Sequence, residues 1–385
     1  SALAVSPQGD VAAYWTQTPT WEAAVAVRPH DADTFGASVT WTGFPRYQTR
    51  LDYGFDNRLV GPASRGSEAG TFDLFFATFT GGGSTFEPIA TGFAEFVYDT
   101  RVCAAANGDA MITWIDRGAG DTSAVRARFR TGSVWGPTSL VSAPEDLKVW
   151  GLKVACSPDG NHLVLYGNNS VMPRALEARV YDAALGDWKS PPSALGDRSY
   201  NATVVTTRTT RGERYVAWEE YDSGTSTKYY MVRSFDGTTW STPDTLASGS
   251  SLYSLLLAAA GDDVHAVWLR GINNELVTRR LAAGTSTWSS ETPLDSTSAV
   301  QEVSMSGGGF GDALVAWAEA TAIRTRAYSP TTQTWASTVT LKEDLLEVGY
   351  GSLHSIIDPR RRATVIWTEY ESPSNSFSAK ARTFR

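Results

Sequence analysis

Cysteine is nearly absent from this chain of 385 residues, where it occurs only as Cys103 and Cys156. Neither belongs to a C-x-x-C pair, so the usual redox and zinc motifs are excluded. The two residues lie about one internal repeat apart, which leaves either a disulfide between neighbouring repeats or two buried free thiols. We expect free thiols, because a disulfide needs Cα atoms within about 7 Å and equivalent strands of neighbouring repeats usually lie farther apart.

Histidine is also scarce. Its four residues fall in different repeats and lack the H-x-x-x-H or H-E-x-x-H spacing of a zinc site: His30, His162, His265 and His354. The aspartate-containing strings at 29–33 and 157–161 lack the length and terminal glutamate of a calcium loop. The sequence has no G-x-S-x-G motif, no Walker loop and no G-x-G-x-x-G before a helix. We therefore predict no metal site and no cofactor.

Positive charge and long apolar runs are the other absences. With 33 Lys and Arg against 41 Asp and Glu, the net charge of −8 argues against nucleic acid or an anionic membrane as partner. No apolar stretch approaches the ~20 residues of a membrane span. The first residues already resemble a strand, so the printed sequence contains no signal peptide. A content of 42% hydrophobic residues with 34 glycines indicates a folded, turn-rich chain.

What the chain does have is a repeat. An aromatic residue ends an apolar run in most repeats: Trp15, Trp114, Tyr166, Trp218, Trp268, Trp317 and Trp367. A second aromatic marker recurs out of phase with the first, usually with a leucine several residues later: Phe35, Phe86, Trp135, Trp188, Trp240, Trp288 and Trp335. A period of about 40 to 50 residues with four short β-runs per unit is typical of a β-propeller.

We predict an all-β fold, a β-propeller of eight four-stranded blades that closes into one ring and forms a single domain over residues 1–385. Seven blades are the alternative, because segment 58–64 lacks the aromatic ending in the second repeat. The eighth repeat stops at its third strand, so that blade either has three strands or is completed by residues upstream of Ser1. The approximate blade limits are 1–46, 47–97, 98–149, 150–199, 200–252, 253–300, 301–349 and 350–385.

Three recurring positions are expected on the rim where second strands end and first strands begin. The first position is an aromatic residue at the start of the first strand: Tyr47, Tyr98, Trp150, Tyr200, Tyr253 and Tyr350. Aromatic rings stack on sugars or cations, which makes these residues candidates for ligand binding. In the alternative, each ring fills the seam between two blades.

The second position carries a cation in three consecutive repeats only: Arg50, Arg101 and Lys153. Three cations near one rim suit a carboxylate or sulfate ligand, because arginine can bind either in a bidentate way. The alternative is that these cations are solvated or paired with acids such as Asp52 and Asp99.

The third position is a carboxylate two residues after the strand-ending tryptophan: Asp116, Glu220, Glu319 and Glu369. The third strands bring arginines alongside: Arg128, Arg179, Arg233, Arg279, Arg326 and Arg382. In the sixth repeat the signs are reversed, as Arg270 and Glu275. We interpret most of these carboxylates as partners of an arginine in the same blade rather than as catalytic groups.

Two strings connect the chain to known families. SFDGTTW at 234–240 resembles a shortened Asp-box, the turn of sialidase-like propellers, and ARVYDAALGDWKSP at 178–191 is similar to the repeats of secreted bacterial propeller proteins. The resemblance implies a propeller fold over nearly the whole chain. Sialidase catalytic roles do not carry over, because the F-R-I-P segment is replaced by FPRY at 44–47. Fucose-binding propeller lectins are similar in residue type, since their inter-blade pockets use an arginine, a glutamate and an aromatic residue.

We therefore expect a non-enzymatic, lectin-like module, secreted or on the cell surface, that binds a carbohydrate or another surface polymer at several similar sites. The alternative is a polysaccharide lyase or glycoside hydrolase acting on an acidic polysaccharide, with Tyr98, Tyr350, His354 or Glu369 as acid/base groups. A third hypothesis is a protein-interaction scaffold, in which the unfinished eighth blade accepts a strand from a protein partner.

Overall fold

The computed structural model describes residues 2–17, 22–41, 52–54, 58–66, 71–80, 83–93, 97, 99–117, 122–142, 148–170, 174–189, 193–196, 199–295, 300–345, 352–371 and 376–384. Within them every regular element is a β-strand, and the strands build eight sheets in chain order. This confirms the predicted fold class, an all-β propeller with eight blades. No helix in these residues is long and apolar enough to cross a bilayer.

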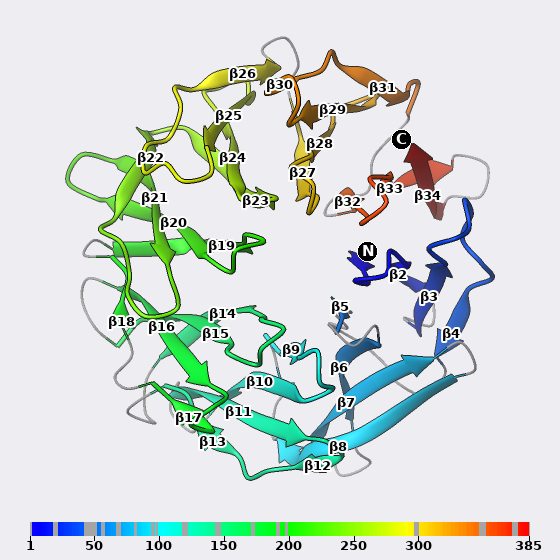
Figure 1. The fold of residues 1–385 in the computed structure, drawn as a ribbon, viewed down its shortest axis with the longest axis vertical. Helices are drawn as coiled ribbons and strands as arrows, with labels where there is room; N and C mark the ends of the chain where they lie inside the picture. The colour runs from blue at the N-terminus through cyan, green and yellow to red at the C-terminus, as the bar shows by residue number, and fades with distance from the viewer. Residues whose placement is uncertain are drawn as a thin grey trace. The chain divides into compact units, whose positions relative to one another are not determined.

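The first four blades hold strands β1 to β18, of which β2 to β18 are labelled in Figure 1. The first blade contains β1 (Ala2–Val5), β2 (Val11–Gln17), β3 (Glu22–Arg28) and β4 (Val39–Trp41). The second contains β5 (Asp52–Tyr53), β6 (Leu59–Gly66), β7 (Phe72–Thr80) and β8 (Gly83–Phe93). The third contains β9 (Arg101–Ala104), β10 (Ala110–Arg117), β11 (Ser123–Thr131), β12 (Val134–Trp135) and β13 (Ser139–Leu140). The fourth contains β14 (Val149–Ala155), β15 (Leu163–Asn168), β16 (Ala175–Asp182), β17 (Asp187–Trp188) and β18 (Ser193–Ala194).

The last four blades follow the same order. The fifth contains β19 (Ser199–Arg208), β20 (Arg214–Asp222), β21 (Thr227–Phe235) and β22 (Asp244–Gly249). The sixth contains β23 (Leu252–Ala260), β24 (Asp263–Arg270), β25 (Glu275–Leu281) and β26 (Thr292–Asp295). The seventh contains β27 (Glu302–Gly307), β28 (Ala313–Ala318), β29 (Ile323–Ser329), β30 (Thr334–Trp335) and β31 (Val339–Lys342). The eighth contains β32 (His354–Ile357), β33 (Ala363–Glu371) and β34 (Ser376–Phe384).

The second blade settles the blade count. Its strands pair in the order β5-β6-β7-β8, so the segment that departs from the repeat is a blade and the seven-blade alternative is wrong. Gly61 and Pro62 of β6 lie opposite Ala77 and Phe76 of β7. Phe76 is fully buried, so aromatic residues of the third strand supply here the bulk that the second strand supplies elsewhere.

The second strands form the core of the blades. In β24, for example, every residue from Val264 to Leu269 is buried, and Trp268 has no exposed surface. A strand covered on both faces is apolar throughout rather than alternating, which is why these runs are continuous in the sequence. The strand-ending tryptophan is therefore a packing residue of the blade.

The chain forms two compact units. The first holds Ser1–Val5, Pro29–Thr34 and Thr203–Arg385, and the second holds Ser6–Arg28 and Phe35–Ala202. Within the first unit the opening strands β23, β27, β32 and β1 lie side by side, and within the second unit β5, β9 and β14 do (Figure 1). The prediction that residues 1–385 form one domain stays a prediction.

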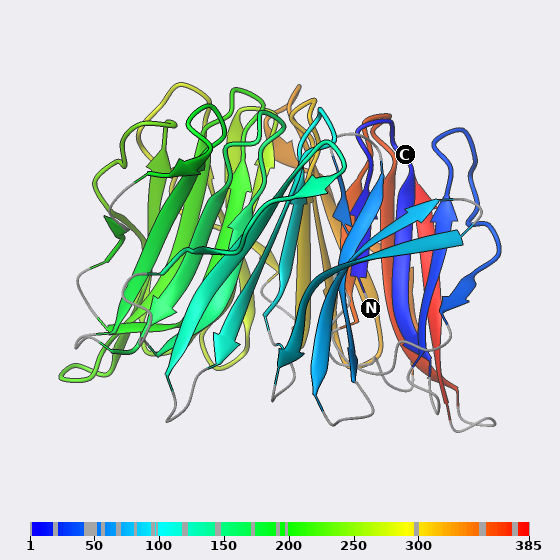
Figure 2. The same cartoon turned by 90° about the horizontal axis from the view of Figure 1, so that it is seen from below.

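Each blade has two ends, defined by its turns. Because consecutive strands are antiparallel, the turns joining strands one to two and three to four share one end, which we call the hairpin end. The other end holds the two-to-three turns and the entries to the first strands, where the ligand-binding rim was predicted. Figure 2 shows the blades of each unit edge-on, with the strands of neighbouring blades running alongside one another.

Cys103 and Cys156 form a disulfide, so the expectation of two free thiols is wrong. Their Cα atoms are 5.3 Å apart, inside the range that a disulfide bridges. The physical reason is that β9 and β14 are the first strands of the third and fourth blades and lie in contact. Equivalent residues converge at this edge of the blades.

The second aromatic marker fills the interfaces between consecutive blades, which we call seams and number by the two blades. In three described seams the ring of a fourth-strand tryptophan lies against the preceding blade, with ring centroids 5.2 Å apart for Trp135 and Phe76, 5.6 Å for Trp188 and Phe129, and 5.5 Å for Trp335 and His265. Trp288 lies in the buried cluster of seam 5/6 together with Tyr215. A blade's fourth strand therefore completes the seam before it.

Candidate functional site

A pocket of about 680 Å³ opens at the hairpin end of seam 5/6. Its lining combines two aromatic residues with charged and hydroxyl side chains from both blades: Glu213, Tyr215, Val232, Arg233, Ser234, Ser241, Thr242, Pro243, Asp244, Asp262, Leu281, Ala282, Gly284, Thr285, Ser286 and Trp288. This volume lies within the usual range of small-ligand pockets, about 300 to 1,000 Å³. We call it the 5/6 pocket.

Glu213 lines one side of the 5/6 pocket. It ends a tight turn in which Gly212 has a φ of 94°, a backbone conformation that a side chain would strain. The Tyr215 hydroxyl donates to a Glu213 carboxylate oxygen at 3.1 Å. Burial, followed by the Glu213 charge, raises the pKa of Tyr215 to about 12. Tyr215 therefore stays a neutral donor, and Glu213 keeps further acceptor sites at the pocket.

Asp262 lines the pocket from the sixth blade. It accepts hydrogen bonds from the Thr210 hydroxyl and from the Arg211 backbone at 3.0 Å. The Arg211 guanidinium forms an ion pair with it at 2.8 Å. The Thr210 hydrogen bond is the largest cause of its lowered pKa, so Asp262 is ionised. The two blades are thus tied together beside the pocket.

The turn that resembles an Asp-box lies next to the third side of the pocket, which Ser234 and Ser241 line. Asp236 accepts hydrogen bonds from the backbone of Thr238 and Thr239, both at 2.7 Å. The bond from the Thr239 backbone is the first cause that lowers the pKa of Asp236 to about 2. The turn sets Trp240 against Arg233, whose guanidinium carbon lies 5.8 Å from the ring centroid. Arg233 in turn donates to the Ser241 carbonyl at 2.6 Å, which fixes the wall of the pocket.

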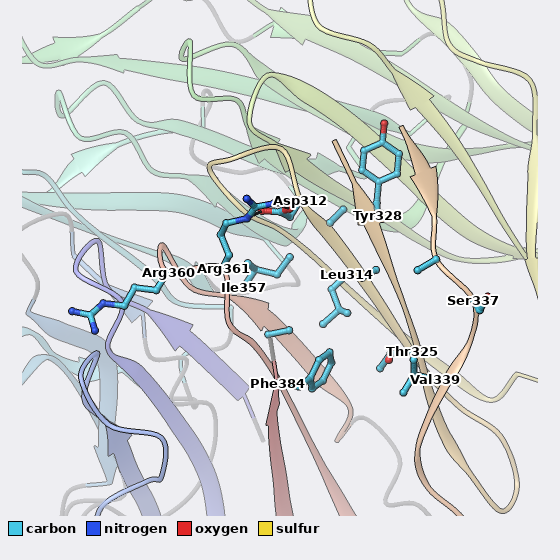
Figure 3. A pocket seen from close by; sticks show the side chains of 14 residues that line it. Asp312, Leu314, Thr325, Tyr328, Ser337, Val339, Ile357, Arg360, Arg361 and Phe384 are labelled. Carbon is cyan, nitrogen blue, oxygen red and sulfur yellow. Dashed lines mark hydrogen bonds and ion pairs between the residues drawn. The ribbon is translucent and has the colours of Figure 1, made fainter. Parts of the chain in front are cut away.

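A second pocket, of about 470 Å³, occupies the equivalent place in seam 7/8. Figure 3 shows Leu314, Ile357 and Phe384 among its lining side chains, with Arg361 reaching Asp312 beside them. Asp312 and Arg361 form an ion pair between the seventh and eighth blades. We call this the 7/8 pocket; its lining is mainly apolar.

The predicted rim aromatics are only partly within the described residues. Tyr47, Tyr98 and Tyr350 lie outside them, and Tyr200 is described only through its place in β19. The Trp150 indole donates to the Asn169 side chain at 2.7 Å. Tyr253 is 44% exposed, and the Lys228 ammonium lies 5.2 Å from its ring centroid.

A backbone irregularity follows these aromatics. The next residue has a positive φ in three repeats: 51° at Asp99, 66° at Gly151 and 56° at Ser254. The register of the first strand shifts directly after Trp150 and after Tyr253. Such β-bulges re-aim a side chain relative to its strand, so these aromatics are set apart from the regular strand that follows them. Their role in ligand binding stays a prediction.

The predicted cations are also only partly described. Arg50 lies outside the described residues. Arg101 is 11% exposed and donates to the Asp99 carboxylate at 3.3 Å and to the Thr100 carbonyl at 2.8 Å. Lys153 lies in β14, half-buried, opposite Leu165. Arg101 thus has the ion-pair partner that the alternative interpretation named.

Two of the four strand-ending carboxylates, Asp116 and Glu319, pair with an arginine of their own blade as interpreted, but not with the arginines that were expected. Asp116 pairs with Arg126 at 2.6 Å, Glu319 with Arg324 at 2.7 Å and Arg270 with Glu275 at 2.7 Å. Register explains the difference: Arg126 and Arg324 lie directly opposite the strand-ending tryptophans Trp114 and Trp317. The arginine two residues further along is out of reach of the carboxylate.

Four of the six further arginines instead link blades. In these four a terminal guanidinium nitrogen donates to a carbonyl in the outermost segment of the preceding blade: Arg128 to Ile89 at 2.5 Å, Arg179 to Val141 at 2.5 Å, Arg279 to Leu246 at 2.7 Å and Arg382 to Leu341 at 2.7 Å. We call these residues the seam arginines. Their role depends on two blades together, which a single repeat cannot reveal.

The two candidate acid/base residues that are described lie in the eighth blade. Glu369 accepts a hydrogen bond from the Trp367 indole at 3.3 Å and lies 3.6 Å from the Lys380 ammonium. The same indole contact recurs between Trp218 and Glu220 at 2.9 Å, so it belongs to the repeat. His354 lies in β32, opposite Ile366. No group of three metal-ligating side chains is found in the described part of the chain.

No family model matches the chain, and no curated protein matches it in sequence. Among solved structures it is similar to the polysaccharide lyase Uly1, with a TM-score of 0.55 and 11% identity over 83% of this chain and 86% of that chain. It is also similar to a puromycin-hydrolyzing peptidase of Mycobacterium tuberculosis, with a TM-score of 0.52 and 13% identity over 87% of this chain and 53% of that one. At these identities the likeness shows the fold alone, and the peptidase is matched over only about half its length.

Proposed function

We propose that this chain is a non-enzymatic, carbohydrate-binding β-propeller that holds a glycan or another surface polymer at the 5/6 pocket. The observation that carries the proposal is the composition of that pocket: Trp288 and Tyr215 lie beside Glu213, Arg233 and Asp244. A sugar ring has an apolar C–H face that packs on aromatic rings, and hydroxyls that bind carboxylates and guanidinium groups. The pocket offers both kinds of partner at one place.

A further observation supports the proposal. One of the similar structures is a polysaccharide lyase, so this fold is used on carbohydrates elsewhere. The predicted rim aromatics, among which Tyr253 is exposed, are proposed as additional contacts for an extended polymer.

A secreted or cell-surface location is part of the same proposal. The disulfide between Cys103 and Cys156 supports it, because such bonds persist mainly in oxidising compartments.

The test is binding of the labelled chain to an array of neutral and acidic glycans at two salt concentrations. Glu213→Gln removes a charged acceptor from the 5/6 pocket and should weaken binding at least tenfold, since hydrogen bonds to charged groups contribute about 1.5 to 3 kcal/mol. Glu343→Gln, on an exposed segment of the seventh blade, is the matched control and should bind like the parent chain. Absence of binding across the array, or equal binding by both variants, would count against the proposal.

The second candidate is a lyase or hydrolase acting on an acidic polysaccharide, with Arg50, Arg101 and Lys153 neutralising its carboxylates. The similarity to Uly1 favours it. Against it, the described candidates are held in contacts of their own, Arg101 by Asp99 and Glu369 by Trp367 and Lys380. Arg101→Ala separates the two functions: it should abolish turnover of a uronate polymer if the chain is an enzyme and only reduce avidity if it is a binding module.

A further inference from the structure

One position near the end of the third strand places a side chain in the seam before its blade. In five blades the residue at this position pairs with the fourth-strand tryptophan: Arg130, Tyr181, Phe235, Leu281 and Tyr328. The Tyr181 ring stacks on Phe129 across seam 3/4, with ring centroids 3.7 Å apart, and the Tyr328 ring lies 4.4 Å from that of His265 across seam 6/7. Leu281 is the smallest of the five residues, so seam 5/6 has the least bulk at this position.

A second position faces the first across the seam. It lies in the third strand of the preceding blade, one residue before that blade's own first position. In seam 3/4 it is Phe129, which stacks on Tyr181. In seam 6/7 it is Arg280, whose guanidinium carbon lies 5.5 Å from the Tyr328 ring centroid. In seam 5/6 it is Ser234, so a hydroxymethyl group stands where the other two seams have a ring or a guanidinium group.

Ser234 and Leu281 both line the 5/6 pocket. Because both are small where seams 3/4 and 6/7 have large side chains, they leave a space that those seams fill, and we call this space the ring slot. Two nearly buried aromatic residues, Tyr215 and Trp288, line the same pocket and are 9% and 6% exposed. A pyranose ring is about as large as an aromatic side-chain ring and packs well on aromatic faces. The ring slot therefore suits one sugar ring.

Two carboxylates of the pocket lining, Glu213 and Asp244, keep an unbalanced negative charge. Glu213 accepts a hydrogen bond from the Tyr215 hydroxyl, and Asp244 accepts one from the Thr245 backbone at 2.8 Å. These donors are neutral, and neither carboxylate forms an ion pair with a residue that the structure describes. Both side chains are exposed, so a ligand in the pocket can reach them.

The other charges of the lining do not offset these two carboxylates. Asp262 pairs with Arg211 at 2.8 Å, so its charge is already balanced. Arg233 contributes one positive charge to the lining. Two unbalanced carboxylates and one guanidinium group leave the pocket negative overall. Such a lining attracts a cation and repels a uronate or a sulfate.

We propose that Ser234 and Leu281 are the specificity-determining residues of the 5/6 pocket and that its ligand is an amino sugar. One pyranose ring of the ligand occupies the ring slot, and the protonated amine on that ring binds the carboxylates of Glu213 and Asp244. Seams 3/4 and 6/7 do not take a ring in this way, because their own side chains fill the two positions. This inference rests on the proposed carbohydrate binding and names the class of sugar that the pocket takes.

The probes are β-1,4-linked tetrasaccharides that differ in charge, made of glucosamine, N-acetylglucosamine, glucose or glucuronate. Isothermal titration calorimetry measures their binding to the parent chain at a pH at which the amine is protonated. We expect the glucosamine tetramer to bind at least tenfold more tightly than the two neutral tetramers, because hydrogen bonds between charged groups are the stronger ones. The glucuronate tetramer should bind most weakly. Added salt should reduce the difference between glucosamine and glucose.

Two substitutions test the ring slot from its two sides. Leu281→Tyr introduces the residue type of seam 6/7 and should weaken binding of the glucosamine tetramer at least tenfold. Leu281→Met keeps an apolar side chain of similar volume, so it is the matched control and should bind like the parent chain. Ser234→Phe introduces the residue type of seam 3/4 from the opposite blade, at a position that is only half-buried, and should weaken binding to a similar extent. Urea unfolding of each variant checks that it is folded.

Glu213→Gln tests the class of sugar separately, because it should reduce the preference for glucosamine over glucose. Equal binding of the glucosamine and glucose tetramers by the parent chain would overturn this inference, as would unchanged binding by the folded Leu281→Tyr and Ser234→Phe variants. Either result leaves the proposed carbohydrate binding in place, as does binding on the glycan array without binding of any tetramer. If neither the array nor any tetramer binds, the proposed function fails and this inference fails with it.

Discussion

The 5/6 and 7/8 pockets occupy the same place in two seams of the same unit. Glu213 and Asp312 lie at equivalent positions, each directly before its second strand, and an arginine–aspartate ion pair crosses both seams nearby. The direction of that pair is reversed: Arg211 of the fifth blade pairs with Asp262 of the sixth, whereas an aspartate of the seventh blade pairs with an arginine of the eighth. Only the residue from the following blade keeps its position, because Asp262 and Arg361 each lie six residues before the strand-ending tryptophan.

The difference lies in the fourth strand of the following blade. In seam 5/6 Trp288 is 6% exposed and closes the apolar interior, so the remaining pocket is a polar space above it. In seam 7/8 no such tryptophan is present in the described residues, and the pocket reaches the apolar side chains Leu314 and Ile357. In the described residues the two pockets thus differ by one aromatic side chain.

Among the substitutions that test this difference between the two seams, Trp288→Ala should change stability the most. Removing a buried tryptophan should lower the free energy of unfolding by about 3 to 5 kcal/mol, because the seam is left with a cavity. Urea denaturation followed by circular dichroism measures the change. Phe384→Ala, at the equivalent seam but beside an existing cavity, should cost clearly less. Equal losses for the two variants would mean that seam 7/8 is packed as tightly as seam 5/6.

Seam 6/7 contains a buried histidine, His265, that should make the folded chain less stable at acid pH. This residue of β24 lies in seam 6/7 with no exposed surface, its ring 4.4 Å from that of Tyr328. Burial is the main cause that lowers the pKa of His265 from 6.5 to about 4, with the Arg280 charge also lowering it and Asp263 opposing. The folded state therefore disfavours the protonated imidazole.

The sign of the pH effect follows from that shift. Between about pH 6.5 and pH 4 the imidazole of His265 is protonated in the unfolded chain but neutral in the folded chain. The free energy of unfolding therefore falls as the pH falls through this range, and this contribution is constant below it. The shift in the pKa of His265 corresponds to a loss of about 3 kcal/mol in the free energy of unfolding. Urea unfolding at pH 7, 5.5 and 4 measures it, and the difference between the parent chain and His265→Phe isolates this residue from other titrating groups. A constant difference across the three pH values would contradict the prediction.

The sequence predicted those features that a single blade determines. Eight blades and their strand positions follow from the repeated aromatic markers, because each strand is in the same environment in every blade. The local ion pair of Arg270 with Glu275 was predicted for the same reason, since its two strands are joined by one short turn.

Features that depend on two blades were not predicted. The disulfide requires the convergence of β9 and β14, and the seam arginines require the fourth strand of the preceding blade. The two described pockets lie at the hairpin end, whereas the candidate ligand residues were chosen at the other end. One signal was present in the sequence: within residues 1–385 the last copy of the second aromatic marker is Trp335. Its consequence for seam 7/8 required knowing that this marker packs between blades.

The seam arginines allow the stability of the two seams to be compared at the level of single hydrogen bonds. Arg279 donates both to the Leu246 carbonyl of the fifth blade and to the Ser289 carbonyl, just after Trp288 of its own blade, at 2.7 and 2.6 Å. Arg279→Ala should therefore cost about 1.5 to 3 kcal/mol, the range for hydrogen bonds made by a charged group. Within the described residues Arg382→Ala removes the contact to Leu341 and should cost less in urea denaturation. Equal losses for the two variants would mean that the contact of Arg279 with Ser289 adds nothing measurable to stability.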